Sequence, residues 1–408
     1  MTLDPVHVEG IADLASAIAR TVDDSDHPDL ARTVWEEYLP LYDDGPVVEP
    51  VGEKRLRSAD VDEAALSDPP FSTVHGVDSG TINPTTFQNG LVIDVAQAAM
   101  ASVPTDLDLH RSRHLVATVH ASDTTISFPE DWTTYDDGYS RQRVLHAPRV
   151  SRYAEGVVHA LSLYLAESTH ARYHANVVSD LLVLDGPLYP TELLSWRERD
   201  RELAAVAAEA TPRAVVENYV RLVETFVERG VPVVGFVKTP SGGTLTNELR
   251  ARGVRSPWPD DTALFRRLLE RREDGERLTD RLTFTSWLRS RGGTDGALAA
   301  DGDAFGVERR LDPAAYEVTT MYVYDPRVDV CYRVEAPYAA VEDDADRDAL
   351  TRQVVHDVAV GRGPPPAVEK ADELARIGRP EKASLRRKFE QRLDSERVRT
   401  YDEVRWEE

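Results

Sequence analysis

Apolar residues in the first part of the chain recur at helical spacing, and further on they form short strand-like runs. Within residues 8–40 the spacing predicts a helical N-terminal extension. Beyond Ser72 three apolar runs are separated by glycine, asparagine or proline. They predict an antiparallel meander of strands at 73–77, 91–95 and 113–119.

The middle of the chain alternates between helical and strand-like patterns. Residues 150–176 form the longest helical pattern, and a strand follows at 180–184. A second helix at about 197–229 leads to the strand 231–237, whose apolar run suits a parallel position inside a sheet. This order of elements is typical of an α/β fold.

The patterns divide the chain into four segments. Residues 1–69 are predicted to be the N-terminal helical extension and residues 70–240 the α/β core. Residues 241–312 are polar and rich in Gly, Arg and Asp, which predicts an insertion or lid. Residues 313–408 supply return strands and a helical C-terminal tail that complete the core.

The composition narrows the class of protein. The 408 residues carry a formal net charge of −24, with five lysines among the 48 lysines and arginines. A cytosol with molar salt would select such a surface, because at 1 M salt the Debye length falls to about 3 Å and surface repulsion is screened. We therefore interpret the charge as halophilic adaptation, which leaves room for a local arginine-lined groove that holds phosphate.

Cysteine use and hydropathy indicate where the protein works. Cys331 is the single cysteine, which excludes intramolecular disulfides and cysteine-based zinc sites. No apolar run approaches the roughly 18 residues that span a bilayer, and the N-terminus is too acidic for a signal peptide. We expect a soluble, cytoplasmic protein with no membrane partner.

Two aspartates directly follow predicted strands. They are Asp78 in Val74-His-Gly-Val-Asp78-Ser-Gly and Asp185 in Leu181-Leu-Val-Leu-Asp185-Gly-Pro. Ligands gather at the carboxyl ends of strands in an α/β sheet, and two carboxylates brought together there repel unless a cation neutralises them. The sequence therefore predicts a Mg²⁺ or Mn²⁺ site, for which Glu155 and Glu167 of the preceding helix are further candidate ligands.

Histidines near these motifs are interpreted as structural. Strand alternation places His75 on the face opposite Asp78. His159, His170 and His174 lie on the helix at 150–176, but no His-Glu-x-x-His order accompanies the His170 and His174 pair, so we predict surface positions.

The same motifs resemble the NurA family of archaeal DNA-repair nucleases. The resemblance rests on Asp78-Ser-Gly after a strand, a helix glutamate and Leu-Asp185-Gly-Pro-Leu. It covers about residues 70–378 and implies an RNase H-like mixed sheet flanked by helices. It continues through Gly235-Phe-Val-Lys238, Tyr332-Arg333-Val-Glu335-Ala-Pro337 and Pro365-Pro-Ala-Val-Glu-Lys-Ala371-Asp372.

The resemblance assigns roles to particular residues. It implies that Asp78 and Asp185 are metal ligands. In the family a glutamate lies shortly before the second aspartate, which favours Glu167. In contrast, a helix that runs antiparallel to the strand after it would bring its N-terminal residue Glu155 near the carboxyl end of that strand. Both glutamates stay open, and Glu167 is preferred. Asp372 stands where the family has a histidine, and we carry the ligand role over to it, with a shift toward Mg²⁺.

The implied activity is metal-dependent hydrolysis of DNA phosphodiesters, by a single-strand endonuclease and 5′-to-3′ exonuclease that uses Mn²⁺ or Mg²⁺. The implied partners are DNA, a second copy in a homodimer and the hexameric HerA helicase, with which double-strand breaks are processed for homologous recombination. Lys238 and Arg333 are candidate DNA-phosphate contacts, although Lys238 could also be an ordinary strand-end lysine and Arg333 could pair with Glu335.

Two other functions remain open. The Asp372 replacement is compatible with a non-catalytic DNA-binding or adaptor subunit that retains the fold. The run Val77-Asp78-Ser-Gly80-Thr81 also resembles the phosphate loop of actin-like ATP-dependent phosphotransferases, but a second phosphate hairpin and a glycine-rich adenosine motif are not evident. The basic run Arg386-Arg387-Lys388 is interpreted as a solvated helix face rather than a DNA clamp.

Overall fold

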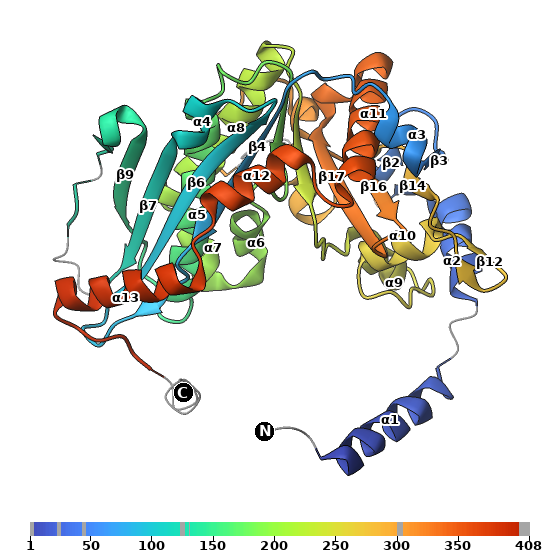
Figure 1. Ribbon diagram of the computed structural model, residues 1–408, viewed down its shortest axis with the longest axis horizontal. Helices are drawn as coiled ribbons and strands as arrows, with labels where there is room; N and C mark the ends of the chain where they lie inside the picture. The colour runs from blue at the N-terminus through green and yellow to red at the C-terminus, as the bar shows by residue number, and fades with distance from the viewer. Residues whose placement is uncertain are drawn as a thin grey trace.

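One large mixed β-sheet runs through the computed structural model and carries helices on both faces (Figure 1). The structure describes residues 4–22, 26–42, 46–122, 127–129, 131–299 and 305–399. The ends of the first and last predicted segments, 1–3 and 400–408, lie outside them. The mixed α/β sheet flanked by helices is confirmed, and the RNase H-like assignment stays a prediction.

Five neighbouring strands form the part of the sheet that matters for the site. In spatial order they are β7 (Arg113–His120), β6 (Val92–Val103), β4 (Val74–Thr81), β10 (Leu181–Leu184) and β11 (Val233–Val237). The pairs β4/β6 and β6/β7 are antiparallel, as the predicted meander requires. β10 is parallel to both β4 and β11, so its buried, wholly apolar sequence occupies the predicted central position.

Helices cover the two faces of these strands. α5 (Ala154–Tyr173) packs on β6, β7 and β4, with α8 (Ala210–Glu228) against it. α12 (Pro366–Ala375) packs on the opposite face of β4 and β6 and lies in front of the sheet in Figure 1. α11 (Asp344–Gly361) buries its apolar residues in the same core as α12.

The helix predicted at about 197–229 is three helices. Asp200 has an extended backbone (φ −158°) and its side chain accepts a hydrogen bond from the Glu202 backbone N–H, which ends α6 (Thr191–Arg199) and starts α7 (Arg201–Ala207). α8 follows after a short break. The apolar periodicity continues from α6 into α7, so the sequence pattern did not indicate that Asp200 is an N-cap between two helices.

Two of the predicted segments contain short strands that the sequence patterns did not predict. Within the first segment, β2 (Pro46–Pro50) pairs with β15 (Leu288–Ser290), and β3 (Leu56–Asp60) pairs with β14 (Arg281–Thr285). β14 and β15 both pair with β16 (Val318–Asp325) and bring buried Leu282 and Trp287 into the core. Part of the segment 241–312, residues 281–290, therefore belongs to the sheet, and an insertion or lid stays a prediction for the rest of that segment.

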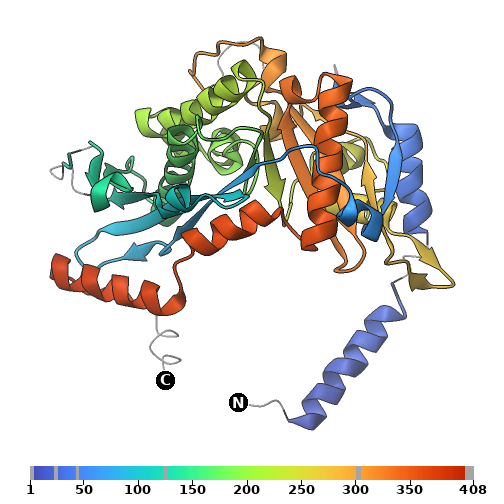
Figure 2. The ribbon, with the colours of Figure 1, turned by 45° about the horizontal axis from the view of Figure 1, so that its top comes forward.

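α1 (Pro5–Ala19) projects away from the body, as both views show (Figures 1 and 2), and its larger apolar residues are exposed. Among the described residues no helix is long and apolar enough to cross a membrane. The remaining elements are β1 (Leu41–Tyr42), β5 (Thr85–Thr86), β8 (Thr133–Tyr135), β9 (Ser140–His146), β12 (Arg272–Glu273), β13 (Glu276–Arg277), β17 (Val330–Pro337), α1 (Pro5–Ala19), α2 (His27–Thr33), the π-helix Val34–Tyr38, α3 (Val61–Leu66), α4 (Leu107–Arg111), α9 (Thr244–Ala251), α10 (Asp261–Leu269) and α13 (Arg379–Leu393).

Candidate metal centre

Asp78 lies in β4 between two glycines that share its face of the strand. A Cβ atom at Gly76 would lie 2.4 Å from the Ala367 backbone, and one at Gly80 would lie 2.3 Å from the Ala375 carbonyl oxygen. Only glycine at both positions lets α12 lie directly on β4. This close approach brings Asp372 of α12 to Asp78.

Asp185 is placed beside Asp78 by the parallel pairing of β10 with β4. Leu184 is the last paired residue of β10, opposite Val77, and the Asp185 backbone N–H donates to the Val77 carbonyl oxygen at 3.0 Å. The loop after Asp185 then packs over β11, where a Cβ atom at Gly235 would lie 2.5 Å from the Leu188 nitrogen. Chain geometry therefore fixes the position of Asp185.

Asp78, Asp185 and Asp372 form a compact carboxylate group. Each offers an oxygen atom, and these atoms lie within 4.8 Å of one another. Within the described ranges this is the one such group of three or more potential ligands. Burial, followed by repulsion from Asp185 and Asp372, raises the pKa of Asp78 to about 7. Burial also raises the pKa of Asp185.

Glu167 lies next to this group, on the α5 side of β4. It is buried and accepts hydrogen bonds from the Ser79 hydroxyl and the Tyr219 hydroxyl, each at 3.3 Å. Burial, followed by the charges of Asp78 and Asp185, raises the pKa of Glu167 to about 8. Glu167 is not one of the three clustered residues, but it faces the same charges.

Glu155 lies elsewhere. It is exposed in the first turn of α5, where it accepts a hydrogen bond from the Thr86 hydroxyl at 2.9 Å. Of the two glutamates left open by the sequence, the structure therefore brings only Glu167 to the aspartates. The sequence analysis did not identify Ser79 and Tyr219 as hydrogen-bond partners of Glu167. Ser79 could have been found, because strand alternation places its side chain on the face of β4 opposite Asp78, which is the face that α5 covers.

Lys238 and Arg333 differ in their surroundings. The Lys238 ammonium forms an ion pair with Asp185 at 2.6 Å and remains partly exposed at the site. Arg333 is buried and pairs with Asp295 at 2.8 Å and Glu335 at 2.9 Å. The expectation that Arg333 contacts DNA needs correction, because an enclosed guanidinium held by two carboxylates is not accessible to a phosphate.

One histidine prediction was also wrong. His170 is buried rather than at the surface, and its Nδ1 lies 2.8 Å from Nδ1 of His114 on β7. α5 is apolar on a broad surface, and its packing on β7 encloses His170. His75 is buried and is not part of the carboxylate group, while His159 pairs with Asp94 at 2.8 Å.

The chemistry of the group suits a hard divalent cation. Three carboxylates from β4, the end of β10 and α12 converge as an all-oxygen donor set, which is what Mg²⁺ and Mn²⁺ prefer. Burial raises the pKa values of Asp78 and Asp185, and repulsion between the carboxylates adds to it; a bound cation would favour the charged forms of both groups.

The sequence profile of the NurA domain matches residues 72–377, three quarters of the chain. The chain belongs to the NurA family. Its fold is similar to the crystal structure of the NurA nuclease from Sulfolobus solfataricus, at 12% identity and a TM-score of 0.51, covering 96% of this chain and 98% of that one. Family and fold together support a nuclease role.

A second solved structure similar to this chain is NurA bound to dAMP and manganese, at 11% identity and a TM-score of 0.45, covering 99% of both chains. Comparison with curated protein sequences gives no match. The NurA match spans β4, α5, β10 and α12, the elements that carry Asp78, Glu167, Asp185 and Asp372.

Proposed function

We propose that this NurA protein is a metal-dependent deoxyribonuclease whose centre is formed by Asp78, Asp185 and Asp372. The observation that carries the proposal is their convergence within 4.8 Å, from three elements of a NurA domain. Asp372 occupies the position where the family resemblance led us to expect histidine. An oxygen donor there is compatible with a hard cation.

Mn²⁺ or Mg²⁺ would be held by these three carboxylates, and when bound it would supply a Lewis acid for the scissile phosphate and an activated water. The chain's own groups then act around the phosphate. Glu167, whose pKa is raised to about 8, can hold a proton at neutral pH and release it once positive charge arrives nearby. The Lys238 ammonium can leave its ion pair with Asp185 and bind a phosphate oxygen instead.

The finer role is also a proposal. A single-strand endonuclease and 5′-to-3′ exonuclease that works in the cytoplasm as a homodimer on the HerA helicase would resect double-strand breaks. Membership of the NurA family supports this role, and the dAMP and manganese in the structure of another NurA are compatible with it.

Cleavage of labelled single-stranded DNA tests the nuclease proposal. Wild type, Asp78→Asn and Asp185→Asn are compared with Mn²⁺, Mg²⁺ or EDTA, using substrates labelled at either end to read polarity. Asp348→Asn is the control, because Asp348 is an exposed aspartate on α11. We expect metal-dependent cutting that each site variant lowers at least about 100-fold, more than the loss of an outer-shell partner causes.

The same experiment separates the nuclease from an adaptor subunit. An adaptor that retains the fold would bind DNA but would not cut it with any metal, even when HerA is added. That result would contradict the nuclease proposal. Equal activity in Asp78→Asn and wild type would instead place the chemistry elsewhere.

A further inference from the structure

α13 is a basic helix in an acidic protein. Its 15 residues carry six cationic and two acidic side chains, whereas the whole chain has a formal net charge of −24. A protein with this net charge repels DNA at long range, so binding requires a local region of the opposite sign. α13 is a candidate for that region.

Contacts with the sheet determine which face of α13 is free. Phe389 and Leu393 pack against the cluster of Phe87, Ile93 and Val119. The Arg386 guanidinium donates to the Ile82 carbonyl oxygen at 2.7 Å, and the Lys382 ammonium donates to the Asn83 side chain at 3.2 Å. These contacts hold one side of the helix against the protein and turn the other side to solvent.

The solvent side of α13 carries Arg379, Arg387, Lys388 and Arg392, which we call the α13 basic face. All four are exposed. Among the described residues none of the four has an ion-pair partner, and helical spacing places one exposed acidic residue, Glu381, on the same side. Four cations on one anchored helix are thus available to an external anion.

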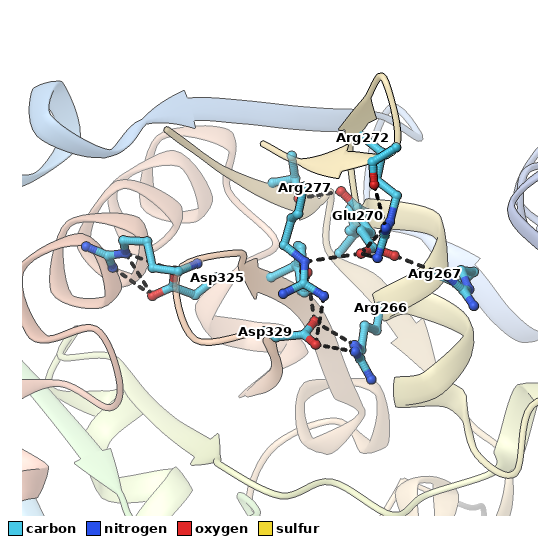
Figure 3. A network of polar contacts seen from close by, with 12 residues as sticks. Arg266, Arg267, Glu270, Arg272, Arg277, Asp325 and Asp329 are labelled. Atoms are coloured by element: carbon cyan, nitrogen blue, oxygen red, sulfur yellow. Dashed lines mark hydrogen bonds and ion pairs between the residues drawn. The ribbon is translucent and has the colours of Figure 1, made fainter. Parts of the chain in front are cut away.

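Many arginines elsewhere in the protein are neutralised by carboxylates. Figure 3 shows this around α10 and the β12/β13 hairpin, where Asp329 pairs with Arg266 and Arg277. In the same network Glu270 pairs with Arg267, Arg272 and Arg277. In contrast to this network, no carboxylate within the described part of the chain pairs with a cation of the α13 basic face.

α13 is connected to both elements that supply Asp372 and Asp78. Three residues separate α12, which carries Asp372, from α13, and among them Arg376 is exposed. Arg386 and Lys382 contact Ile82 and Asn83, just after the strand that carries Asp78. Ile82 lies four residues after Asp78, and an extended chain rises about 3.3 Å per residue, so the two residues are about 13 Å apart along the strand. About four nucleotides of one DNA strand span the same length.

We propose that the α13 basic face binds the phosphate backbone of DNA on its way to or from the aspartate site. This replaces the sequence-based interpretation of Arg387 and Lys388 as part of a merely solvated helix face. This inference rests on the proposed nuclease function and names the element that holds the substrate outside the site. The contacts would be independent of sequence, because guanidinium and ammonium groups at a helix surface meet phosphates and not base edges. In Figure 1 α13 continues from α12 and runs past the ends of β6 and β7.

DNA binding in EDTA tests this inference without requiring cleavage. The variant is Arg379→Gln, Arg387→Gln, Lys388→Gln and Arg392→Gln together, and binding of labelled single-stranded DNA is measured over a range of KCl. The control replaces four other exposed arginines that have no ion-pair partner among the described residues, Arg32, Arg201, Arg271 and Arg281, by glutamine. Circular dichroism and melting confirm that both variants are folded.

We expect the α13 variant to bind DNA at least tenfold more weakly than wild type at the lowest salt concentration. The slope of log K against log salt should be smaller in magnitude by about 3, because each of four lost phosphate contacts contributes about 0.7 to the slope. The control should retain most of the wild-type slope. Equal loss in both variants would overturn the inference, because it would report net charge alone.

The remaining outcomes separate this inference from the nuclease proposal. Wild type that binds through α13 but never cuts DNA would support the inference and contradict the nuclease. Wild type that cuts DNA while the α13 variant binds unchanged would overturn the inference alone. If the α13 variant changes the oligomeric mass in light scattering and leaves DNA binding intact, the face serves a second copy of the chain and the inference fails.

Discussion

At the scale of single residues, the candidate centre is a place where negative charge has been enclosed. Burial and mutual repulsion raise the pKa of Asp78 to about 7, and Glu167 responds to the same charges. Lys238 is the one cation that pairs directly with the aspartates among the described residues, through Asp185. Charge balance at the site therefore depends on Lys238 until a metal ion binds.

Replacing Lys238 by glutamine should expose this dependence. Without the ammonium, the repulsion between Asp78 and Asp185 increases, so the melting temperature without metal should fall. The rise in melting temperature on adding Mn²⁺ should become larger, because the ion relieves more repulsion. Melting scans with EDTA and with Mn²⁺ measure both effects.

Lys370→Gln is the matched control, since the Lys370 ammonium donates to the Thr105 hydroxyl at 3.2 Å and has no ion-pair partner among the described residues. It should leave the Mn²⁺ effect as in wild type. An unchanged Mn²⁺ effect in Lys238→Gln would contradict the electrostatic account of the site.

Asp357 provides a pH prediction outside the site. It is buried in α11 with one hydrogen bond, donated by the Gln353 amide at 3.0 Å, and burial raises its pKa to about 7. The folded state therefore favours the protonated Asp357, whereas the carboxyl has its ordinary pKa of 3.8 in the unfolded chain. The stabilisation from this difference is fully present below pH 3.8 and is lost as the pH rises to about 7.

Asp357→Asn should consequently stabilise the protein at pH 8, by up to about 4 kcal/mol. The gain should shrink steadily as the pH is lowered toward 4. Chemical unfolding of both proteins across this pH range measures it. A constant difference between the two proteins at every pH would contradict the raised pKa.

At the scale of elements, the sequence predicted those parts of the site that are local in the chain. Asp185 directly follows β10, whereas Asp78 follows an apolar run but lies inside β4, which extends to Thr81. Parallel pairing of β10 with β4 brings the two aspartates together. Asp372 could be proposed only through the family resemblance, because it comes from a helix far along the chain. The choice between Glu155 and Glu167 depended on how α5 sits on the sheet, which periodicity does not specify.

The errors at this scale have the same cause. β14 and β15 are short, and their apolar residues alternate with Arg, Thr and Ser, so their composition resembled a polar insertion. Their partners, β2 and β3, lie more than 200 residues earlier in the chain. Arg333 was assigned to DNA for a similar reason, since its partner Asp295 lies in a distant 3₁₀ turn.

The contact between α12 and β4 gives a prediction about Asp372. A methyl group at Gly80 would lie 2.3 Å from the Ala375 carbonyl oxygen, so Gly80→Ala should push the end of α12 off the strand. We expect a loss of about 1–3 kcal/mol in stability, as for overpacked cores, and weaker Mn²⁺ binding because Asp372 moves away. Unfolding and Mn²⁺ titration calorimetry measure these two effects.

Gly156→Ala serves as the comparison, because nothing lies within 4 Å of a Cβ atom there and the position is inside α5. It should retain Mn²⁺ binding and be as stable as wild type or more so. Unaltered Mn²⁺ binding in folded Gly80→Ala would show that Asp372 does not depend on this close approach.

At the scale of the whole molecule, a net charge of −24 opposes the compact state. Salt screens this repulsion, with a Debye length of about 10 Å at 0.1 M and about 3 Å at 1 M. The melting temperature should therefore rise as KCl is increased toward molar concentrations, by several degrees or more. A melting temperature that is flat or falls with KCl would contradict the halophilic interpretation.

The measurement that most directly tests the central claim is anomalous X-ray scattering from crystals soaked in Mn²⁺. We predict a peak at coordinating distance from carboxylate oxygens of Asp78, Asp185 and Asp372, which is absent in crystals of Asp185→Asn. No peak between these three residues in well-soaked wild-type crystals, or a peak that persists in Asp185→Asn, would contradict the claim that they form one metal centre.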